Sequence, residues 1–202
     1  MLNCGKNIAV IGIGVAGSHI ATLLYYLTEK LYVVDFDTVE KKNMVNQIYR
    51  TQDIGRPKAE ALAGMLPGTI PLVSRGESVS CTVFCDVNLV VSCPDSLASR
   101  RAILERLREI GYSGMYLDVR TLGGVIFAYS APSLDALPPE YMDSLSPENL
   151  TRGACGIVTP ASTGWAAARE AARIESEEYT MTRTICQPKE VSNAIGQTIT
   201  IA

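Results

Sequence analysis

The stretch Ile8–Leu27, which reads IAVIGIGVAGSHIATLLYYL, decides the fold. Its first four residues form an apolar run of strand length, and its second half has apolar residues at helical spacing. Gly12, Gly14 and Gly17 lie between the two segments in a G-x-G-x-x-G pattern. Glycines in this context let backbone N–H groups and a helix N-terminus approach a phosphate closely. The stretch therefore predicts a nucleotide-binding strand–turn–helix unit, and it leaves NAD, FAD and ATP open.

A carboxylate ends the next predicted strand. The apolar segment Leu31–Val34 is followed directly by Asp35, and Asp37 comes shortly after it. In dinucleotide-binding units an acid at this position accepts hydrogen bonds from ribose hydroxyls. A strand-end capping acid is the structural alternative for Asp35. The glycine pattern and the acid together favour an adenine nucleotide.

Strand and helix patterns alternate along most of the chain, which predicts a parallel α/β sheet in a single domain spanning residues 1–202. Strands are expected at 8–11, 31–34, 70–73, 79–84, 88–92, 115–119 and 125–129, with two short strands within 179–202. Helices are expected at 18–27, 57–66, 94–110 and 159–177, the last with Trp165, Ala168 and Ala172 on one side. Residues 133–153 show little periodicity and are expected to form a long connecting loop.

Composition excludes several classes of protein. The 202 residues carry a net charge of −3, which argues against a general nucleic-acid surface. No apolar run approaches the roughly 18 residues that span a bilayer, and the N-terminus has no secretory pattern. The six cysteines contain no C-x-x-C pair, so we expect no structural zinc. The single histidine argues against a histidine-based metal site, and we expect a cytoplasmic chain with reduced thiols.

Several motifs beyond the glycine loop resemble one family. The matching segments are Gly12–Ser18, Val34–Glu40, Asn43, Gln47, Gly55–Ala59, Val91–Ser96 with Arg100, and 154–172. Together they resemble the ThiF/MoeB/HesA group of the ubiquitin-activating superfamily, and the resemblance covers most of residues 7 to 175. It implies a Rossmann-like, doubly wound, mainly parallel sheet with a C-terminal antiparallel extension.

The resemblance also implies an activity. Members of this group use ATP to adenylate a C-terminal carboxylate and release pyrophosphate. For this chain it implies adenylation of a small ubiquitin-like or sulfur-carrier protein that ends in Gly-Gly. Residues 133–153 would form a crossover loop that covers the bound tail, and a homodimer is expected.

Individual roles follow from the same resemblance. The implied nucleotide-binding residues are Gly12, Gly14, Gly17, Ser18, Asp35, Asp37, Asn43 and Lys58, with Lys58 and Asn43 on the phosphates. Asp95 would work with magnesium, and Cys155 is a candidate thiol acceptor for the activated carbonyl. A lysine in the first turn of a helix costs up to about 1 kcal/mol against the helix dipole. The position of Lys58 at the start of the predicted 57–66 helix is explained if its ammonium group reaches a phosphate, which would compensate this cost.

The sequence departs from the family pattern in its arginines. Asn46 stands where relatives carry an arginine, and the second family arginine, which a partner subunit donates from an N-terminal extension, has no counterpart. Such arginines contribute roughly 10³–10⁵ in rate to phosphoryl transfer. Arg50, Arg56 or a partner protein would have to supply the charge.

Structural alternatives stay open for several of these residues. Asp95 is also suited to be the N-cap of a helix. Lys58 could instead be a lysine exposed to solvent, and Cys155 a small residue that packs beside its neighbours. His19 fits a surface or packing role better than a phosphate contact, and Cys93 fits the core. We expect the arginines at 100, 101, 106 and 108 to lie on a solvent-exposed face of their helix.

Three alternative functions also stay open. A non-catalytic nucleotide-binding subunit would explain the missing arginines. Adenylation of a peptide or a tRNA base fits the same fold, although the net charge disfavours tRNA. An NAD-dependent oxidoreductase fits the glycine loop alone, because no residue pair suited to hydride transfer stands out.

Overall fold

The strand and helix that flank the glycine loop lie at the centre of one mixed sheet. The computed structural model describes residues 6–122, 125–145, 161–176, 182–186 and 197–200. Strand β1 (Asn7–Ile11) leads through the loop into helix α1 (Val15–Leu24), which begins three residues before the predicted helix. Alternate residues of β1 point to opposite faces of the sheet, so Ile8 and Val10 enter one apolar core and Ala9 and Ile11 enter the other.

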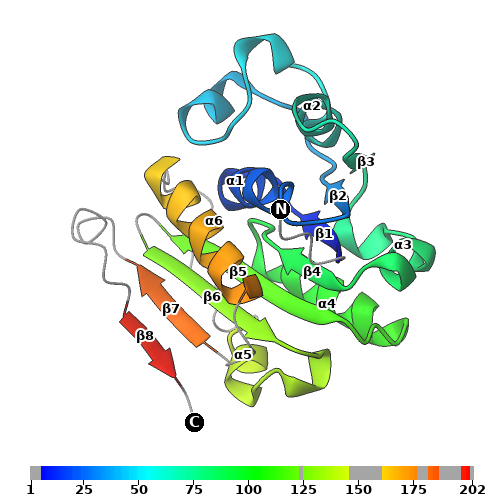
Figure 1. Cartoon of the computed structure of the whole chain (residues 1–202), viewed down its shortest axis with the longest axis vertical. Helices are drawn as coiled ribbons and strands as arrows, with labels where there is room; N and C mark the ends of the chain where they lie inside the picture. Colours follow the sequence, from blue (N-terminus) through cyan, green and yellow to red (C-terminus); the bar gives the residue numbers. More distant parts are fainter. Residues whose placement is uncertain (1–5, 123–124, 146–160, 177–181, 187–196, 201–202) are drawn as a thin grey trace.

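The sheet is mainly parallel, as predicted. Its order across the described residues is β3-β2-β1-β4-β5-β6-β7-β8, and the first five strands in that order run parallel (Figure 1). The remaining strands are β2 (Lys30–Val34), β3 (Ile70–Leu72), β4 (Leu89–Ser92), β5 (Met115–Leu122), β6 (Val125–Ala131), β7 (Thr182–Cys186) and β8 (Gln197–Thr200). The last three pair antiparallel and form the predicted C-terminal extension. The strand order reverses between β1 and β4, and ligands of such sheets bind at that switch point.

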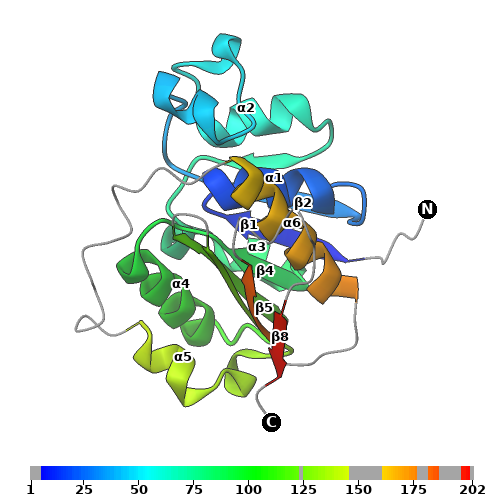
Figure 2. The same cartoon turned by 90° about the vertical axis from the view of Figure 1, so that its left-hand side faces the viewer.

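Helices cover both faces of the sheet. The other helices are α2 (Lys58–Met65), α3 (Cys81–Asp86), α4 (Leu97–Glu109), α5 (Pro139–Asp143) and α6 (Ala161–Ser176), joined by short 3₁₀ turns at Lys41–Val45, Thr51–Asp53, Gly76–Ser78 and Leu134–Ala136. Residues of α1, α2 and α6 share one core, and residues of α3, α4 and α5 share the other (Figure 2). No helix in these described ranges is long and apolar enough to cross a bilayer.

The predicted strand at 79–84 is wrong, because this segment forms helix α3. The hydroxyl of Ser80 accepts a hydrogen bond from the backbone N–H of Thr82 and caps the helix. Val79, Phe84 and Val87 are buried against the core below it. Their contacts with the core outweigh the strand propensity of the local sequence.

The first part of the predicted 133–153 loop is also folded, which corrects the expectation of a structureless connection. Four apolar residues, Leu134, Leu137, Tyr141 and Leu145, are buried in the core beside α4. Their separations of three, four and four residues match a helical face. Residues 146–153 lie outside the described part of the chain.

Helix α6 packs closely on α1 through Gly164. A Cβ added at Gly164 would lie 2.3 Å from Cδ2 of His19, so only glycine permits this approach. Of the residues expected on one side of this helix, the Trp165 side chain is half-exposed, whereas Ala168 is buried together with Ala166 and Ala167.

His19 has the packing role that its place in α1 suggested. Its ring is buried and lies 5.1 Å from the Trp165 ring, centroid to centroid. Burial lowers the pKa of His19, so the neutral ring donates from Nε2 to the carbonyl of Asn46 over 3.2 Å. This bond ties the loop that carries Asn43 to the α1–α6 pair.

Candidate functional site

A cleft of about 390 Å³ opens at the carboxyl ends of β1, β2 and β4, at the switch point of the sheet. Gly12 and Gly14 form one wall, and the acids Asp35 and Asp37 follow from β2. Asp95 closes the side that follows β4. A larger cleft of about 620 Å³ lies around Gly111–Met115, away from the glycine loop and the acids. The polar groups expected to bind a nucleotide therefore converge on the smaller cleft.

The three glycines of the loop have different structural roles. Gly12 has φ +83°, and a Cβ on it would lie 2.7 Å from the carbonyl carbon of Cys93. A Cβ on Gly17 would lie 2.0 Å from the carbonyl oxygen of Gly12, so this glycine lets helix and loop pack together. A Cβ on Gly14 would meet no described atom within 4 Å, and it would take up space in the cleft. The first turn of α1 also leaves backbone N–H groups without helical acceptors.

These roles predict opposite effects of two alanine substitutions. Gly17→Ala should lower the free energy of unfolding by about 1–3 kcal/mol, because the added methyl overlaps the Gly12 carbonyl. Gly14→Ala should leave stability unchanged and weaken ATP binding about tenfold, because the methyl fills the space beside the exposed N–H groups. Urea unfolding and calorimetric titration with ATP measure the two effects. Equal ATP affinities for Gly14→Ala and the wild type would show that phosphate does not approach this loop.

Asp35 is buried against the glycine loop. Its Oδ2 accepts a hydrogen bond from the backbone N–H of Ile13 over 2.9 Å, and its Oδ1 accepts one from the N–H of Asp37 over 2.8 Å. Burial raises the pKa of Asp35, and the positive charge of Lys58 acts in the opposite direction. Each carboxylate oxygen has a second acceptor position, which is available to a ribose hydroxyl.

Lys58 is a buried cation, so the reading of this residue as a solvated lysine is wrong. It lies in the first turn of α2, with its Nζ 2.8 Å from Oδ2 of Asp37 and its side chain largely covered. Its backbone N–H donates to the carbonyl of Asp37. The negative charge of Asp37 offsets the unfavourable helix-dipole position. The lysine is thus held in the cleft, where it can meet an anionic ligand.

Asn43 is fixed by its own loop. Its Oδ1 accepts a hydrogen bond from the backbone N–H of Glu40 over 2.7 Å, which assigns the amide orientation. The amino group remains as the donor available to a ligand. Gln47 also lines the cleft, and its buried Oε1 has no partner within the described residues.

Asp95 follows β4 with an exposed side chain at the wall of the cleft. Its carboxylate makes no hydrogen bond or ion pair with any residue in the described ranges. The N-cap of α4 is Ser96, whose Oγ accepts from the N–H of Ser99 over 3.1 Å, so the N-cap reading of Asp95 is wrong. An unpaired carboxylate beside a predicted triphosphate site has the hard oxygen donors that Mg²⁺ prefers.

The two arginines expected to replace the missing family arginine are engaged elsewhere. Arg50 and Arg56 both pair with Asp53, whose carboxylate is fully buried, at 3.4 and 3.3 Å. Neither is among the cleft-lining residues of the described chain. Arg75, which sequence reasoning missed, does line the cleft, and its guanidinium lies 4.3 Å from the centroid of the Phe36 ring. Its position at the carboxyl end of β3 was the available signal.

Other predicted site residues are placed differently. Ser18 is completely buried in α1 and does not line the cleft as described, although its N–H bonds the carbonyl of Gly14. Cys93 is buried, as expected for a core residue, and burial raises the pKa of its thiol to about 12. Cys155 lies outside the described residues.

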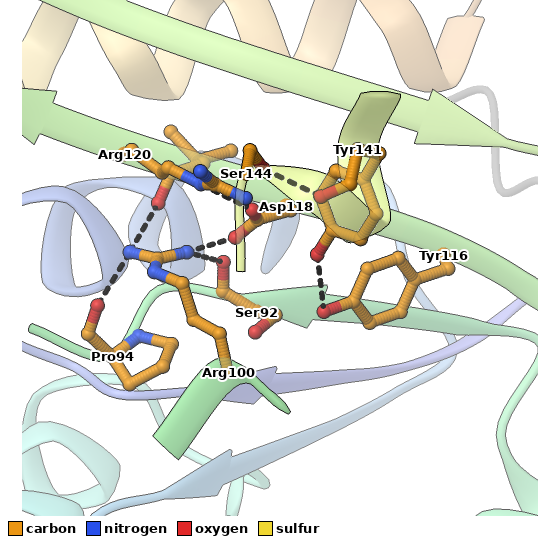
Figure 3. A network of polar contacts seen from close by, with 9 residues as sticks. Ser92, Pro94, Arg100, Tyr116, Asp118, Arg120, Tyr141 and Ser144 are labelled. Carbon is orange, nitrogen blue, oxygen red and sulfur yellow. Dashed lines mark hydrogen bonds and ion pairs between the residues drawn. The ribbon is translucent and has the colours of Figure 1, made fainter. Parts of the chain in front are cut away.

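Arg100 contradicts the prediction of a solvated face on α4. Its side chain is buried and contacts the carboxylate of Asp118, and Asp118 also accepts from Nε of Arg120 over 2.7 Å (Figure 3). Arg101, Arg106 and Arg108 face outward, and Arg101 pairs with exposed Glu105. The buried arginine lies directly behind the Asp95 turn.

The fold and the cleft together define the class: a doubly wound α/β protein with a glycine loop and a paired lysine at its switch point. Residues 5–184 match the ThiF family. The chain therefore belongs to the ThiF family, as the sequence motifs indicated.

Two curated relatives are named activating enzymes. Human ubiquitin-like modifier-activating enzyme 7 is 31% identical over 148 residues, which is 63% of this chain and 14% of the relative. Rice (Oryza sativa subsp. japonica) ubiquitin-like modifier-activating enzyme 5 is 29% identical over 131 residues, which is 54% of this chain and 31% of the relative. The chain spans less than a third of the length of either relative.

Solved structures support the fold. Escherichia coli MccB crystallised with ATP, and MccB crystallised with AMPCPP and MccA, each superpose with a TM-score of 0.68 at 15% identity. The alignments cover 98% of this chain and 64% of MccB. PaaA gives a TM-score of 0.67 at 13% identity, covering 97% of this chain and 64% of PaaA.

Proposed function

We propose that this chain adenylates the C-terminal carboxylate of a small ubiquitin-like or sulfur-carrier protein, with ATP as the second substrate. The observation that carries the proposal is Lys58, a buried cation held across the cleft from the glycine loop. Membership of the ThiF family and likeness to ubiquitin-like modifier-activating enzymes support the reaction class. A neighbour crystallised with ATP supports the choice of nucleotide.

In the proposed reaction, a carboxylate oxygen of the carrier attacks the α-phosphorus of ATP. A new oxygen–phosphorus bond forms, the bond to the β-phosphate oxygen breaks, and pyrophosphate leaves with its electron pair. Both reactants are anionic, so the site has to supply positive charge and hydrogen-bond donors. In this proposal the backbone N–H groups beside Gly14, the amino group of Asn43 and the ammonium of Lys58 supply them.

Asp35 and Asp95 have separate proposed roles. Asp35 holds the ribose through the acceptor positions that its two backbone hydrogen bonds leave open. Asp95 holds magnesium, because its carboxylate is unpaired and lines the same cleft. Bound magnesium would neutralise phosphate charge and orient the triphosphate.

The charge that the family arginines supply has to come from elsewhere. Arg50 and Arg56 are paired with Asp53, so the proposed sources are Arg75, which lines the cleft, and a second protein chain. A homodimer in the cytoplasm is the arrangement we propose. Cys155 would receive the activated carbonyl.

The missing arginine charge favours one alternative, an accessory subunit that binds ATP without catalysis. ATP–pyrophosphate exchange distinguishes the two functions. Magnesium, labelled pyrophosphate and a panel of carrier proteins ending in Gly-Gly would be tested, with short peptides as a second panel and Asp95→Ala as the control. We expect exchange that depends on one carrier and falls to background in Asp95→Ala.

Two other outcomes decide against the proposal. ATP binding with no exchange on any carrier or peptide would establish the accessory role. Binding of NAD in place of ATP would indicate that the glycine loop belongs to an NAD-dependent oxidoreductase. Exchange supported by peptides alone would correct the substrate class and keep the reaction.

A further inference from the structure

Arg100 makes four contacts that link the end of β4 to the middle of the neighbouring parallel strand β5. Its guanidinium donates to the carbonyl oxygen of Ser92 over 3.1 Å and to that of Val119 over 3.0 Å. It also donates to the carbonyl of Pro94 and to the carboxylate of Asp118 (Figure 3). One side chain therefore joins the end of β4, the middle of β5 and the turn between β4 and α4.

The turn that Arg100 holds carries Asp95. Pro94 directly precedes Asp95, and both line the nucleotide cleft, whereas Arg100 lies behind it. The Asp95 carboxylate has no partner of its own within the described residues. Its position therefore depends on the backbone of the turn, which the bond from Arg100 to the Pro94 carbonyl restrains on one side of Asp95 and the Ser96 cap on the other.

An arginine suits this task better than a lysine. A guanidinium is planar and offers five N–H donors in a rigid fork, so it can hold several carbonyl oxygens at once. A lysine ammonium is a flexible point charge and cannot span the same acceptors. Burial lowers the pKa of Arg100 to about 10, with the nearby Arg120 acting in the same direction, so the side chain stays charged at neutral pH.

We propose that Arg100 is a positioning residue that holds Asp95 in the geometry needed to bind magnesium with the nucleotide. The inference rests on the proposed function, because it assigns Asp95 to the metal. Groups behind a metal ligand typically contribute 10–100-fold to metal affinity or activity. A purely structural role for Arg100 would instead lower stability and weaken every ligand alike.

The test measures binding rather than turnover. Calorimetry gives the Kd of α,β-methylene-ATP in excess Mg²⁺ and in EDTA, and the ratio of the two is the magnesium-dependent gain. Arg100→Lys should reduce this gain roughly 10–100-fold, with the Kd in EDTA unchanged within about twofold. Arg101→Lys is the matched control on the same helix, because Arg101 is exposed and pairs only with Glu105 at 2.8 Å among the described residues.

A double variant separates action through Asp95 from an independent effect. Asp95→Asn should remove the magnesium-dependent gain, and Arg100→Lys with Asp95→Asn should lower it no further, because the two residues act as one unit. Arg100→Gln provides a second variant that leaves Asp118 paired with Arg120 and keeps an amide donor near Pro94. It should lower the gain in the same direction.

Three results would overturn the inference. The first is a magnesium-dependent gain as large in both Arg100 variants as in Arg101→Lys. The second is equally weakened binding in Mg²⁺ and in EDTA for the Arg100 variants, which marks a core role. The third is an intact gain in Asp95→Asn, which removes Asp95 as the metal ligand and with it the positioning role of Arg100. The exchange assay with carrier proteins tests adenylation separately, so failure of either idea is recognisable.

Discussion

Lys58→Met is expected to reduce ATP–pyrophosphate exchange by roughly 10²–10³-fold, the usual cost of removing one preorganised electrostatic group from an active site. The lysine side chain is buried and its ammonium is aligned by Asp37, so its charge is fixed in position before the nucleotide binds. Methionine keeps most of the side-chain volume and removes the charge. The comparison therefore isolates the electrostatic contribution.

Initial exchange rates at saturating carrier measure the effect, with Lys41→Met as the control. Lys41 lies in the neighbouring 3₁₀ turn with an exposed side chain, and its loss should change the rate by less than about twofold. A Lys58→Met protein that retains a third of the wild-type rate would show that the buried lysine does not contact the reacting phosphates.

Asp118→Asn is expected to lower the free energy of unfolding by about 3–5 kcal/mol, the typical cost of removing one partner from a buried ion pair. Asp118 is completely buried between Arg100 and Arg120. The asparagine would leave two guanidinium groups near each other without a compensating charge. Both are largely excluded from water, so solvent cannot replace the lost partner.

Equilibrium unfolding in urea, followed by circular dichroism, measures this loss. Glu105→Gln is the control, because Glu105 pairs with Arg101 at the surface and such pairs contribute about 0–1 kcal/mol. A loss below 1 kcal/mol for Asp118→Asn would show that the two arginines find other partners or that water reaches them.

The parallel core of the sheet was predictable because its signals are local. Each of β1, β2 and β4 is a short apolar run, and the loop between β1 and α1 has glycines that only such a turn requires. Asp35 could be assigned to the cleft because the carboxyl ends of parallel strands meet at one edge. The roles expected for Asn43, Lys58 and Asp95 came from the resemblance to the family, so local pattern was sufficient for the centre of the fold but not for most of the cleft.

The Arg100 environment was only half predictable. Arg100 shares the helical face of Ile103, Leu104 and Leu107, which are buried, and this spacing indicates the core. Its partner Asp118 lies on β5, so the pairing depends on strand order and not on any local pattern. The contact between Arg75 and Phe36 also depends on strand order, because the two residues follow the ends of two different strands.

The misassigned segments show how tertiary contacts override local preference. Residues 79–84 have strand-forming side chains, but a serine cap and a core contact at Phe84 make them a helix. Trp165 is half-exposed and contacts the buried ring of His19, while the three alanines that follow it are buried. Small residues are needed there because α6 approaches α1 so closely.

The packing of α6 on α1 also has a consequence for synthesis of the chain. Gly164 and Trp165 meet His19 across 145 and 146 residues of sequence, so α1 is covered by a helix that is translated much later. Until α6 emerges from the ribosome, an apolar side of α1 faces water next to the glycine loop. Long-range contacts of this kind slow folding and leave nascent chains prone to aggregation. The nascent protein is therefore expected to depend on chaperones until residue 176 has been made.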